Sequence, residues 1–486
     1  MKQTAQSLLM LGAAVLLLMA RASAEAPNLD FAEYPIDGSF QGISCVYIAD
    51  LDLDGDMDIV GGSEWTPWSS SIGIAWWRNE GGSPPTWTRF AVDASFRNVM
   101  SVEVAFIDKD LFPDIVATSW DFHQIAWFSH TGDPTSTWTK AAIESSFINA
   151  HDAECYDIDD DGHVDVVGIN STPGGIMVCY QTGADPPLWT TQDVTSAFDG
   201  GKSVDILDFD HDGDPDLVAA AADADQISWW ENSGGQPIVW LQHDVTSSFN
   251  GSHDFDPGHI NGDGLYDLIA TAYLSGEVAY FTCDDLTADL WTQHTITSQL
   301  GIATKALGRD FDRDGDLDIV AVGKDPGHLL IYENDDFSWL ADTLRMGYLG
   351  GWALACHDFD GDLRPDIVGG ASALGTLSLW MNHSVSAATG ETPRPAIQRL
   401  SNHPNPFMAA TTISLLLPRR MHAELAIYDA TGHLVKRLID GELREGLNQV
   451  IWNGTDASGR SCGSGTFFSR LRMGKTVCTR ALVRPR

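Results

Sequence analysis

The sequence DFDRDGDLDIV at Asp310–Val320 is the most informative part of the chain, because versions of it recur along most of the chain. Asp stands at positions 1, 3, 5 and 9 of this motif, Gly315 stands at position 6, and an apolar pair follows. Self-similarity at a regular spacing indicates a repeat architecture. The seven copies close on Asp58, Asp114, Asp165, Asp216, Asp267, Asp318 and Asp366.

The repeat is about 51 residues long. Successive closing Asp residues lie 56, 51, 51, 51, 51 and 48 residues apart, and five extra residues around 66–70 explain the long first interval. Each repeat holds about four short strand-like runs separated by Gly, Asp and Pro turns. Four-stranded units repeated radially form a β-propeller, so we predict an all-β chain with seven blades. A later strand in six repeats is marked by Trp87, Trp138, Trp189, Trp240, Trp291 and Trp339.

The two ends of the repeat region indicate how the ring closes. The seventh repeat stops near Asn382 and lacks its last strand, whereas FAEYPIDGSF at Phe31–Phe40 aligns with WTRFAVDASF at Trp87–Phe96. We therefore expect the N-terminal segment to supply the outer strand of the last blade, which leaves no open sheet edge between blades. An open solenoid would not need this circular offset.

The acidic loop has the composition of a calcium site. Carboxylates at alternate positions of a tight turn converge, and hard oxygen ligands select calcium, which takes 6–8 of them. We expect side-chain ligands at positions 1, 3, 5 and 9 and a backbone carbonyl at the variable position 7. A metal-free Asp/Gly turn is the alternative for any single copy. An EF-hand is disfavoured, because it needs a Glu at position 12 and flanking helices.

Five loops keep all four carboxylates, so we predict about five structural calcium ions. The second loop has Phe106 at position 1, and the fifth has His259 and Asn261, so we do not expect firm sites there. The seventh loop has Leu363 in place of Gly. The predicted ligands are Asp50, Asp52, Asp54 and Asp58; Asp157, Asp159, Asp161 and Asp165; Asp208, Asp210, Asp212 and Asp216; Asp310, Asp312, Asp314 and Asp318; and Asp358, Asp360, Asp362 and Asp366.

These loops, together with runs such as IAWWRNEGG at Ile74–Gly82 and ISWWENSGG at Ile227–Gly235, resemble the FG-GAP/VCBS repeat family. The resemblance covers about residues 30–385. It implies an extracellular, integrin-α-like calcium-binding propeller that binds proteins or glycans. A few propellers of this kind are polysaccharide lyases.

Net charge separates two parts of the chain and excludes some partners. The whole chain carries −40, which argues against nucleic acid and anionic membranes as partners. Residues 396–486 carry +7 and the remainder carries −47, which indicates a domain boundary.

The first residues have the pattern of a secretory signal peptide. Lys2 precedes an apolar run at Leu8–Ala20, and Ala22-Ser23-Ala24 offers a cleavage site, so we assign residues 1–24 to the signal. No later stretch reaches 18 apolar residues, so the mature chain is expected to have no transmembrane segment and to be soluble outside the cytoplasm.

The C-terminal part is predicted to be a separate β-sandwich. Residues 25–385 form the propeller, 386–398 read as a linker, and 399–486 contain alternating strands and Gly turns. Asn405-Pro406-Phe407, Tyr428-Asp429, Trp452-Asn453-Gly454 and Ser464-Gly465 resemble the FlgD-like immunoglobulin fold, which also serves as a type IX secretion sorting domain. This resemblance implies an outer-membrane secretion machinery as a partner, and a chain that is secreted or held at a bacterial cell surface. A plain spacer sandwich is the alternative.

One further group of polar residues stands out by its register. The strand before each loop should line the central axis, so its first residues should meet at one channel mouth. Candidate ligand-binding residues there are His151, Lys202, His253, Glu103, Glu154, Asp205 and Asp256. A hydrated channel lining is the alternative. Paired aromatics such as Trp76-Trp77 are expected to pack between blades, whereas Trp65 and Trp68 in the first-repeat insertion are candidates for an exposed contact.

Neither an H-E-x-x-H motif nor a phosphate-binding loop is present in the sequence. We therefore expect extracellular binding or adhesion to a glycan or protein rather than catalysis. A polysaccharide lyase or hydrolase with its site at the channel mouth is the competing class, and a structural surface component without a discrete ligand is a third.

Overall fold

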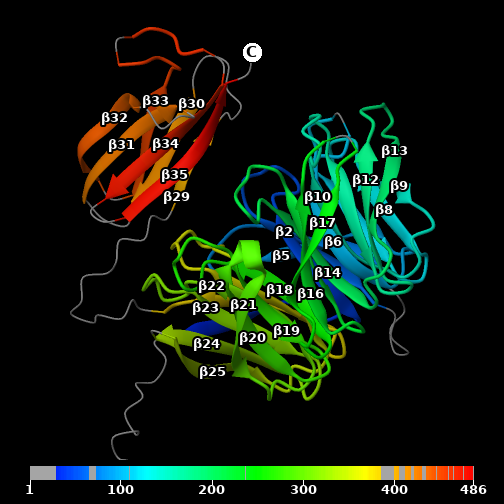
Figure 1. Cartoon of the computed structure of the whole chain (residues 1–486). Helices are drawn as coiled ribbons and strands as arrows, with labels where there is room; N and C mark the ends of the chain where they lie inside the picture. The colour runs from blue at the N-terminus through cyan, green and yellow to red at the C-terminus, as the bar shows by residue number, and fades with distance from the viewer. Residues whose placement is uncertain are drawn as a thin grey trace, which may run out of the picture. The chain divides into compact units, whose positions relative to one another are not determined.

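The structure is a computed structural model with two compact units, Met1–Ala387 and Ala388–Arg486 (Figure 1). In the first unit it describes residues 29–64, 73–108, 110–235, 237–335 and 337–384. In the second it describes 399–403, 411–417, 421–429, 434–444, 446–457, 459–463, 465–473 and 476–484. The predicted signal peptide, the linker, Trp65, Trp68 and Asn405-Pro406-Phe407 lie outside these ranges.

The first unit consists of seven antiparallel four-stranded sheets, as predicted, and we number them blades 1 to 7. Blades 1 to 3 are β2 (Ile43–Ala49), β3 (Asp58–Ser63), β4 (Ile74–Asn79), β5 (Trp87–Asp93); β6 (Val99–Ala105), β7 (Asp114–Ser119), β8 (Gln124–Ser129), β9 (Thr139–Glu144); and β10 (Ala150–Tyr156), β11 (Asp165–Asn170), β12 (Gly175–Gln181), β13 (Trp189–Thr195).

Blades 4 to 6 are β14 (Gly201–Leu207), β15 (Asp216–Ala221), β16 (Gln226–Asn232), β17 (Trp240–Thr246); β18 (Ser252–Gly258), β19 (Asp267–Ala272), β20 (Glu277–Asp285), β21 (Leu290–Thr297); and β22 (Ala303–Arg309), β23 (Asp318–Gly323), β24 (His328–Asp335), β25 (Ser338–Met346). A 3-10 helix, η1 (Leu286–Ala288), joins β20 to β21.

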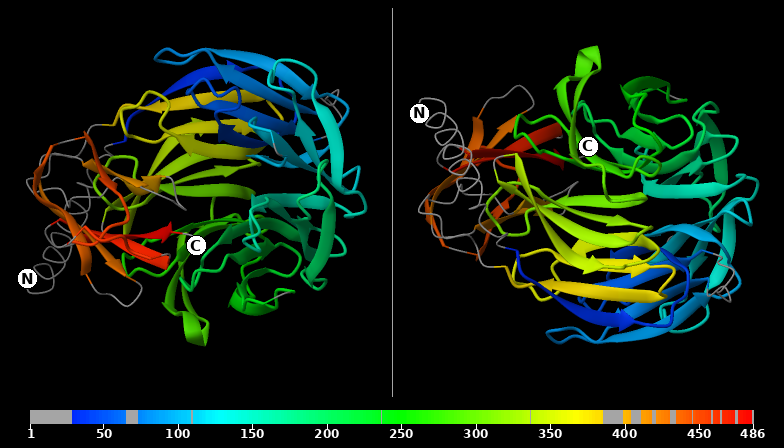
Figure 2. Two further views of the ribbon diagram at one scale, coloured as in Figure 1. Left: turned by 90° about the horizontal axis from the view of Figure 1, so that it is seen from above. Right: turned by 90° about the horizontal axis from the view of Figure 1, so that it is seen from below.

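Blade 7 contains both ends of the ring. Its strands are β26 (Gly351–His357), β27 (Asp366–Ala371), β28 (Thr376–Asn382) and the N-terminal β1 (Phe31–Asp37). β1 pairs antiparallel with β28 from Phe31 opposite Asn382 onward, so the blue first strand lies beside the yellow last strands (Figure 2). The predicted closure by the N-terminal segment is therefore confirmed.

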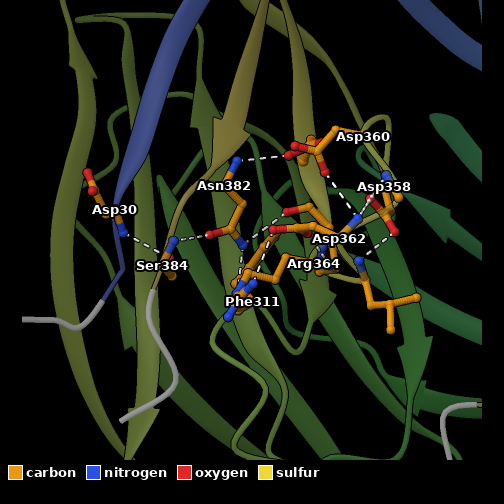
Figure 3. A network of polar contacts seen from close by, with 12 residues as sticks. Asp30, Phe311, Asp358, Asp360, Asp362, Arg364, Asn382 and Ser384 are labelled. Atoms are coloured by element: carbon orange, nitrogen blue, oxygen red, sulfur yellow. Dashed lines mark hydrogen bonds and ion pairs between the residues drawn. The ribbon is translucent and has the colours of Figure 1, made fainter. Parts of the chain in front are cut away.

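Polar contacts reinforce this closure at its end (Figure 3). The Asp30 backbone N–H donates to Ser384 Oγ at 2.8 Å, and the Ser384 N–H donates to Asn382 Oδ1 at 3.0 Å. Asn382 Nδ2 donates to the Phe311 carbonyl of blade 6 at 2.8 Å. The N-terminal strand is thus connected to two blades.

Apolar side chains pack between the blades. Each first strand contacts the first strands of the blades before and after it, and β26 contacts β2, so the ring is continuous. One core cluster joins Ile43 and Trp77 of blade 1 to Leu379 of blade 7. Trp76, Trp77, Trp229 and Trp230 are buried, as expected for packing between blades. Within the described residues, no helix is long and apolar enough to cross a membrane.

The second unit is a two-sheet β-sandwich. One sheet has the order β29 (Arg399–His403), β30 (Thr411–Leu417), β33 (Gly446–Trp452), and the other has β32 (Leu434–Leu443), β31 (Met421–Asp429), β34 (Gly465–Met473), β35 (Thr476–Arg484). Counted within the unit, the first sheet holds strands one, two and five, and the second holds strands three, four, six and seven. An immunoglobulin constant-type domain has the same division except that its fourth strand belongs to the first sheet. Ile413, Leu425 and Trp452 share the core between the sheets.

Candidate metal loops and axial end

The seven acidic loops occupy equivalent places in the seven blades. Each loop connects the first strand to the second, and the closing Asp is the first residue of the second strand in every blade. That Asp pairs with the last residue of the first strand, as Arg309 does with Asp318. The sequence register therefore places all seven loops at one end of the propeller.

The closing Asp is buried and holds the loop in place. Its Oδ2 accepts a hydrogen bond from the backbone N–H of position 2 in every loop, at 3.0 Å for Phe311 and Asp318. In six blades its Oδ1 also accepts an N–H from the third strand, at 2.9 Å for Asn334 and Asp318. Position 9 is therefore a structural link between strands as well as a candidate ligand.

Five loops bring three carboxylates together. In each of them, one carboxylate oxygen from positions 1, 3 and 9 lies within 4.8 Å of the other two. These are the five loops in which the sequence retains every Asp. The groups are Asp50, Asp52, Asp58; Asp157, Asp159, Asp165; Asp208, Asp210, Asp216; Asp310, Asp312, Asp318; and Asp358, Asp360, Asp366.

The Asp at position 5 does not belong to these groups of three. Its Oδ1 accepts the backbone N–H of position 7 instead, at 2.9 Å for Asp56 and Asp54 and at 2.8 Å for Arg364 and Asp362. The same contact occurs for Asp161, Asp212 and Asp314. The four-carboxylate set expected from the sequence is thus present as three convergent carboxylates and one that shapes the turn.

Position 6 needs a left-handed backbone. Gly315 has φ 102°, and its N–H donates to Asp310 Oδ2 at 3.1 Å. Leu363 of the seventh loop has φ 73° and makes the same contact with Asp358 Oδ2 at 2.7 Å. The seventh loop therefore keeps the turn although it lacks the Gly, with a side chain in a conformation that costs about 1–2 kcal/mol.

The loops have unused acceptor oxygens, as a cation site requires. Asp50 Oδ1, Asp159 Oδ1 and Asp310 Oδ1 are buried and have no hydrogen-bond partner. A buried oxygen without a partner is costly unless a missing ion or water satisfies it. Burial, together with repulsion from neighbouring carboxylates, raises the pKa of Asp310, Asp312 and Asp314 to about 6. The carboxylate oxygens of positions 1, 3 and 9 could hold a metal ion, and an all-oxygen donor set is the kind that calcium takes.

The second and fifth loops differ in the way the sequence suggests. In the fifth, His259 Nδ1 lies 2.7 Å from the Leu265 carbonyl, which is the position 7 oxygen expected to face a metal. Asn261 Nδ2 donates to Asp263 Oδ2 at 2.9 Å. This loop therefore satisfies its own polar groups. In the second, Phe106 at position 1 is exposed and offers no ligand.

Carboxylates from several blades interact near the axis. Burial, followed by Glu103, Asp205 and Asp152, raises the pKa of Glu154 well above its usual value. Burial raises the pKa of Glu103 to about 8 and that of Asp205 to about 6. These four residues come from blades 2, 3 and 4.

Basic residues of blade 6 balance part of this charge. Asp256 Oδ2 accepts from Arg309 at 2.8 Å, and Lys305 Nζ lies 3.3 Å from Asp254 Oδ1. The predicted acidic residues are therefore brought together along the axis and are partly neutralised there.

The predicted histidines meet at the end of the axis where the first strands begin. The rings of His151 and His253, from blades 3 and 5, lie 6.2 Å apart. Burial lowers the pKa of His253 to about 3 and that of His151 well below 6.5, so both rings are neutral at neutral pH. Lys202 lies nearby, and its Nζ is 5.7 Å from the centroid of the Trp120 ring.

The sequence reasoning missed Trp120, Tyr273, Lys324 and Trp352 at this same end. A regular signal was present, because the first three lie six residues after a closing Asp. Trp352 occupies the second position of its first strand, as do His151, Lys202 and His253. Reading every repeat at these two positions would have found them.

Comparison with known proteins supports the repeat. A family model described as FG-GAP-like repeat matches residues 157–219 and 310–369, which include the third, fourth, sixth and seventh loops. The chain therefore carries FG-GAP-like repeats within a seven-bladed propeller. No curated protein matches the chain.

The solved structures that match this chain do so at low similarity. PorZ of Porphyromonas gingivalis, described as a bacterial surface component of the type-IX secretion system, has 12% identity and a TM-score of 0.42, covering 93% of this chain and 60% of its own. A fungal alcohol oxidase in complex with copper has 11% identity and a TM-score of 0.49, and the match covers 95% of this chain and 100% of the oxidase chain. A putative 6-phosphogluconolactonase from Bacteroides uniformis has 12% identity and a TM-score of 0.45, covering 81% and 99%. Because these TM-scores are below 0.5, the propeller assignment rests on the strand pairing within this chain.

Proposed function

We propose that this protein is an extracellular calcium-binding propeller that binds a glycan or a protein. The observation that carries the calcium part is the convergence of three carboxylates in each of five equivalent loops. Orphaned carboxylate oxygens in three of these loops support an ion there. All-oxygen ligands favour calcium over the softer metals.

The ions would stabilise the ring rather than take part in chemistry. Each loop lies between a first and a second strand, and its closing Asp bonds to the backbone of a third. A cation held by positions 1, 3 and 9 joins these segments and removes the repulsion between the carboxylates. Extracellular calcium sites of modest affinity, with Kd of about 10⁻⁴–10⁻³ M, suffice for this role.

The second unit is proposed to direct export and attachment. Its two-sheet sandwich is compatible with the FlgD-like resemblance of the sequence. On this proposal the chain is secreted by the type IX route, the outer-membrane machinery recognises this unit, and the propeller acts at the cell surface or outside the cell.

The binding function is tested with the mature chain on a panel of immobilised glycans and extracellular proteins, in calcium and in chelator. Calcium-dependent binding to a defined class supports the proposal. Folded, calcium-loaded protein that binds no member of the panel contradicts it and favours a structural surface role.

A polysaccharide-active enzyme is the second candidate. The observation in its favour is the His151–His253 pair at the axial end, with ring centroids 6.2 Å apart, since imidazole is a common acid–base group in catalysis. Release of reducing ends or of unsaturated sugars from a bound polysaccharide would support the enzyme, and its loss in the His151→Ala variant would assign it to this site. Unchanged polysaccharide after prolonged incubation would leave binding as the function.

A further inference from the structure

Aromatic and imidazole rings meet across the axis at the end where the first strands begin. Trp120 lies 6.2 Å from His151, His151 lies 6.2 Å from His253, and His253 stacks on Trp352 at 5.2 Å. Tyr273 stacks on His253 at 5.4 Å. These five residues come from blades 2, 3, 5 and 7, so contacts between non-adjacent blades are made here. We call them the ring cluster.

Two lysines flank the ring cluster. Lys202 Nζ lies 5.7 Å from the Trp120 centroid, and Lys324 Nζ lies 4.3 Å from the Trp352 centroid. The propeller range 29–384 contains only five lysines. Three of them, Lys202, Lys305 and Lys324, act on His253 through their charge. Scarce positive charge is therefore concentrated at this place in an acidic protein.

The two flanking lysines and the rings keep capacity for a ligand. Lys202 donates to Ser171 Oγ at 3.3 Å, and Lys324 lies 4.0 Å from Glu64, so each ammonium group has further N–H donors. Trp352 Nε1 has no hydrogen-bond partner. Trp120, Tyr273 and Trp352 are only partly buried. Lys305 differs, because it is paired with Asp254.

This combination suits one ligand chemistry. Flat ring faces stack on the apolar faces of sugar rings, and ammonium groups pair with carboxylate or sulfate. We propose that the ring cluster with Lys202 and Lys324 binds an acidic glycan, one that carries uronate or sulfate groups. This deepens the proposed binding function and rests on it, because it names the site and the class of its ligand.

The acidic loops lie at the opposite end of the first strands from the ring cluster. The first strands run from the ring cluster to the acidic loops, and seven residues of strand span about 20 Å. That distance is more than twice the Debye length of about 8 Å at physiological ionic strength. Nearer the ring cluster, Glu64 lies 4.0 Å from Lys324 and Asp223 interacts with Lys202, so a bound acidic group would meet both lysines beside these two carboxylates.

The experiment measures calorimetric binding of hyaluronate, chondroitin sulfate and galacturonate hexasaccharides to the full mature chain in calcium. Neutral hexasaccharides of N-acetylglucosamine and galactose are the comparison. We expect at least one acidic probe to bind at least tenfold more tightly than the neutral probes. The double variant Lys202→Met, Lys324→Met should weaken that binding at least tenfold. Lys140→Met is the matched control, because Lys140 lies 5.1 Å from the Phe96 ring centroid on the exposed strand β9.

Three results would overturn the acidic-glycan proposal. They are equal affinity for acidic and neutral probes, no binding of any acidic probe by folded protein, and an unchanged affinity in the double lysine variant. Calcium bound by the same samples is counted separately. A chain without bound calcium would contradict the calcium proposal while leaving the lysine result interpretable.

Discussion

At the scale of single residues, the closing Asp explains why all seven loops keep the same hydrogen bond to position 2 while only five keep the ligands. In the fifth loop, His259 contacts the Leu265 carbonyl in the place where a metal would bind. The closing residue, Asp267, still accepts N–H groups from Ile260 and Cys283. An Asp at position 9 is therefore needed to accept backbone N–H groups in every loop. Positions 1 and 3 can hold other residues in a loop that binds no ion.

Leu363 offers a test at this scale. Its φ of 73° is unfavourable for a residue with a Cβ, and Gly occupies the same position in the other four Asp-complete loops. We predict that Leu363→Gly raises the free energy of unfolding by about 1 kcal/mol, since the relief of strain exceeds the entropic cost of Gly. Urea unfolding in saturating calcium measures this. Gly361, with φ 76°, supplies the control, and Gly361→Ala should destabilise. A less stable Leu363→Gly variant would contradict the account of the turn.

The loops also predict how pH and calcium compete. Burial raises the pKa of Asp58, Asp165, Asp216 and Asp366 to about 7 and that of Asp318 to about 9, above the ordinary 3.8. Without metal, the folded state binds protons that the unfolded state has lost, so stability falls as pH rises from about 4 toward these values. Calcium needs the ionised carboxylates.

We therefore predict that the increase in Tm caused by saturating calcium is largest near pH 8 and shrinks as the pH falls to 5. Titratable groups away from the loops change Tm equally with and without calcium, so they do not affect the increase in Tm that calcium causes. Scanning calorimetry at a series of pH values measures it. A calcium effect that is constant or that grows toward pH 5 would show that these carboxylates are not the ligands.

At the scale of strands and blades, closure depends on β1. It completes blade 7 by pairing with β28, and Trp77 Nε1 of blade 1 donates to Asp37 Oδ2 at 3.0 Å. We predict that deletion of residues 25–40 unfolds the propeller cooperatively, because the edge of β28 and the core beside blade 1 are exposed together. Loss of the near-UV circular dichroism signal would report it. A truncated chain with undiminished Tm would refute closure by this strand.

The blades and the loops were predictable for a local reason. A period of about 51 residues and an Asp at each second-strand start are properties of single repeats, and the offset between Asn382 and Phe31 follows from counting strands. Contacts across the axis are different. Whether His151 reaches His253 depends on how narrow the ring is, which no single repeat encodes. Likewise, the Asp at position 5 could not be separated from the convergent carboxylates without the turn geometry.

At the scale of the whole molecule, the two ends of the propeller have separate roles in this account. The loops hold charge that must be neutralised for the ring to be stable, and the ring cluster presents aromatic faces and lysines. With external calcium at about 1 mM and Kd of about 0.1 mM, each ion stabilises by about 1.4 kcal/mol, and five together by about 7 kcal/mol. This is comparable to the whole net stability of a domain, about 5–15 kcal/mol.

The number of calcium ions bound per chain distinguishes metal-holding loops from plain acidic turns. Equilibrium dialysis followed by elemental analysis should give five, falling to four in the Asp310→Asn, Asp312→Asn variant and staying at five in Asp263→Asn, which alters the self-satisfied fifth loop. A chain that binds no calcium, or one in which the sixth-loop variant keeps every ion, would contradict the assignment of these loops.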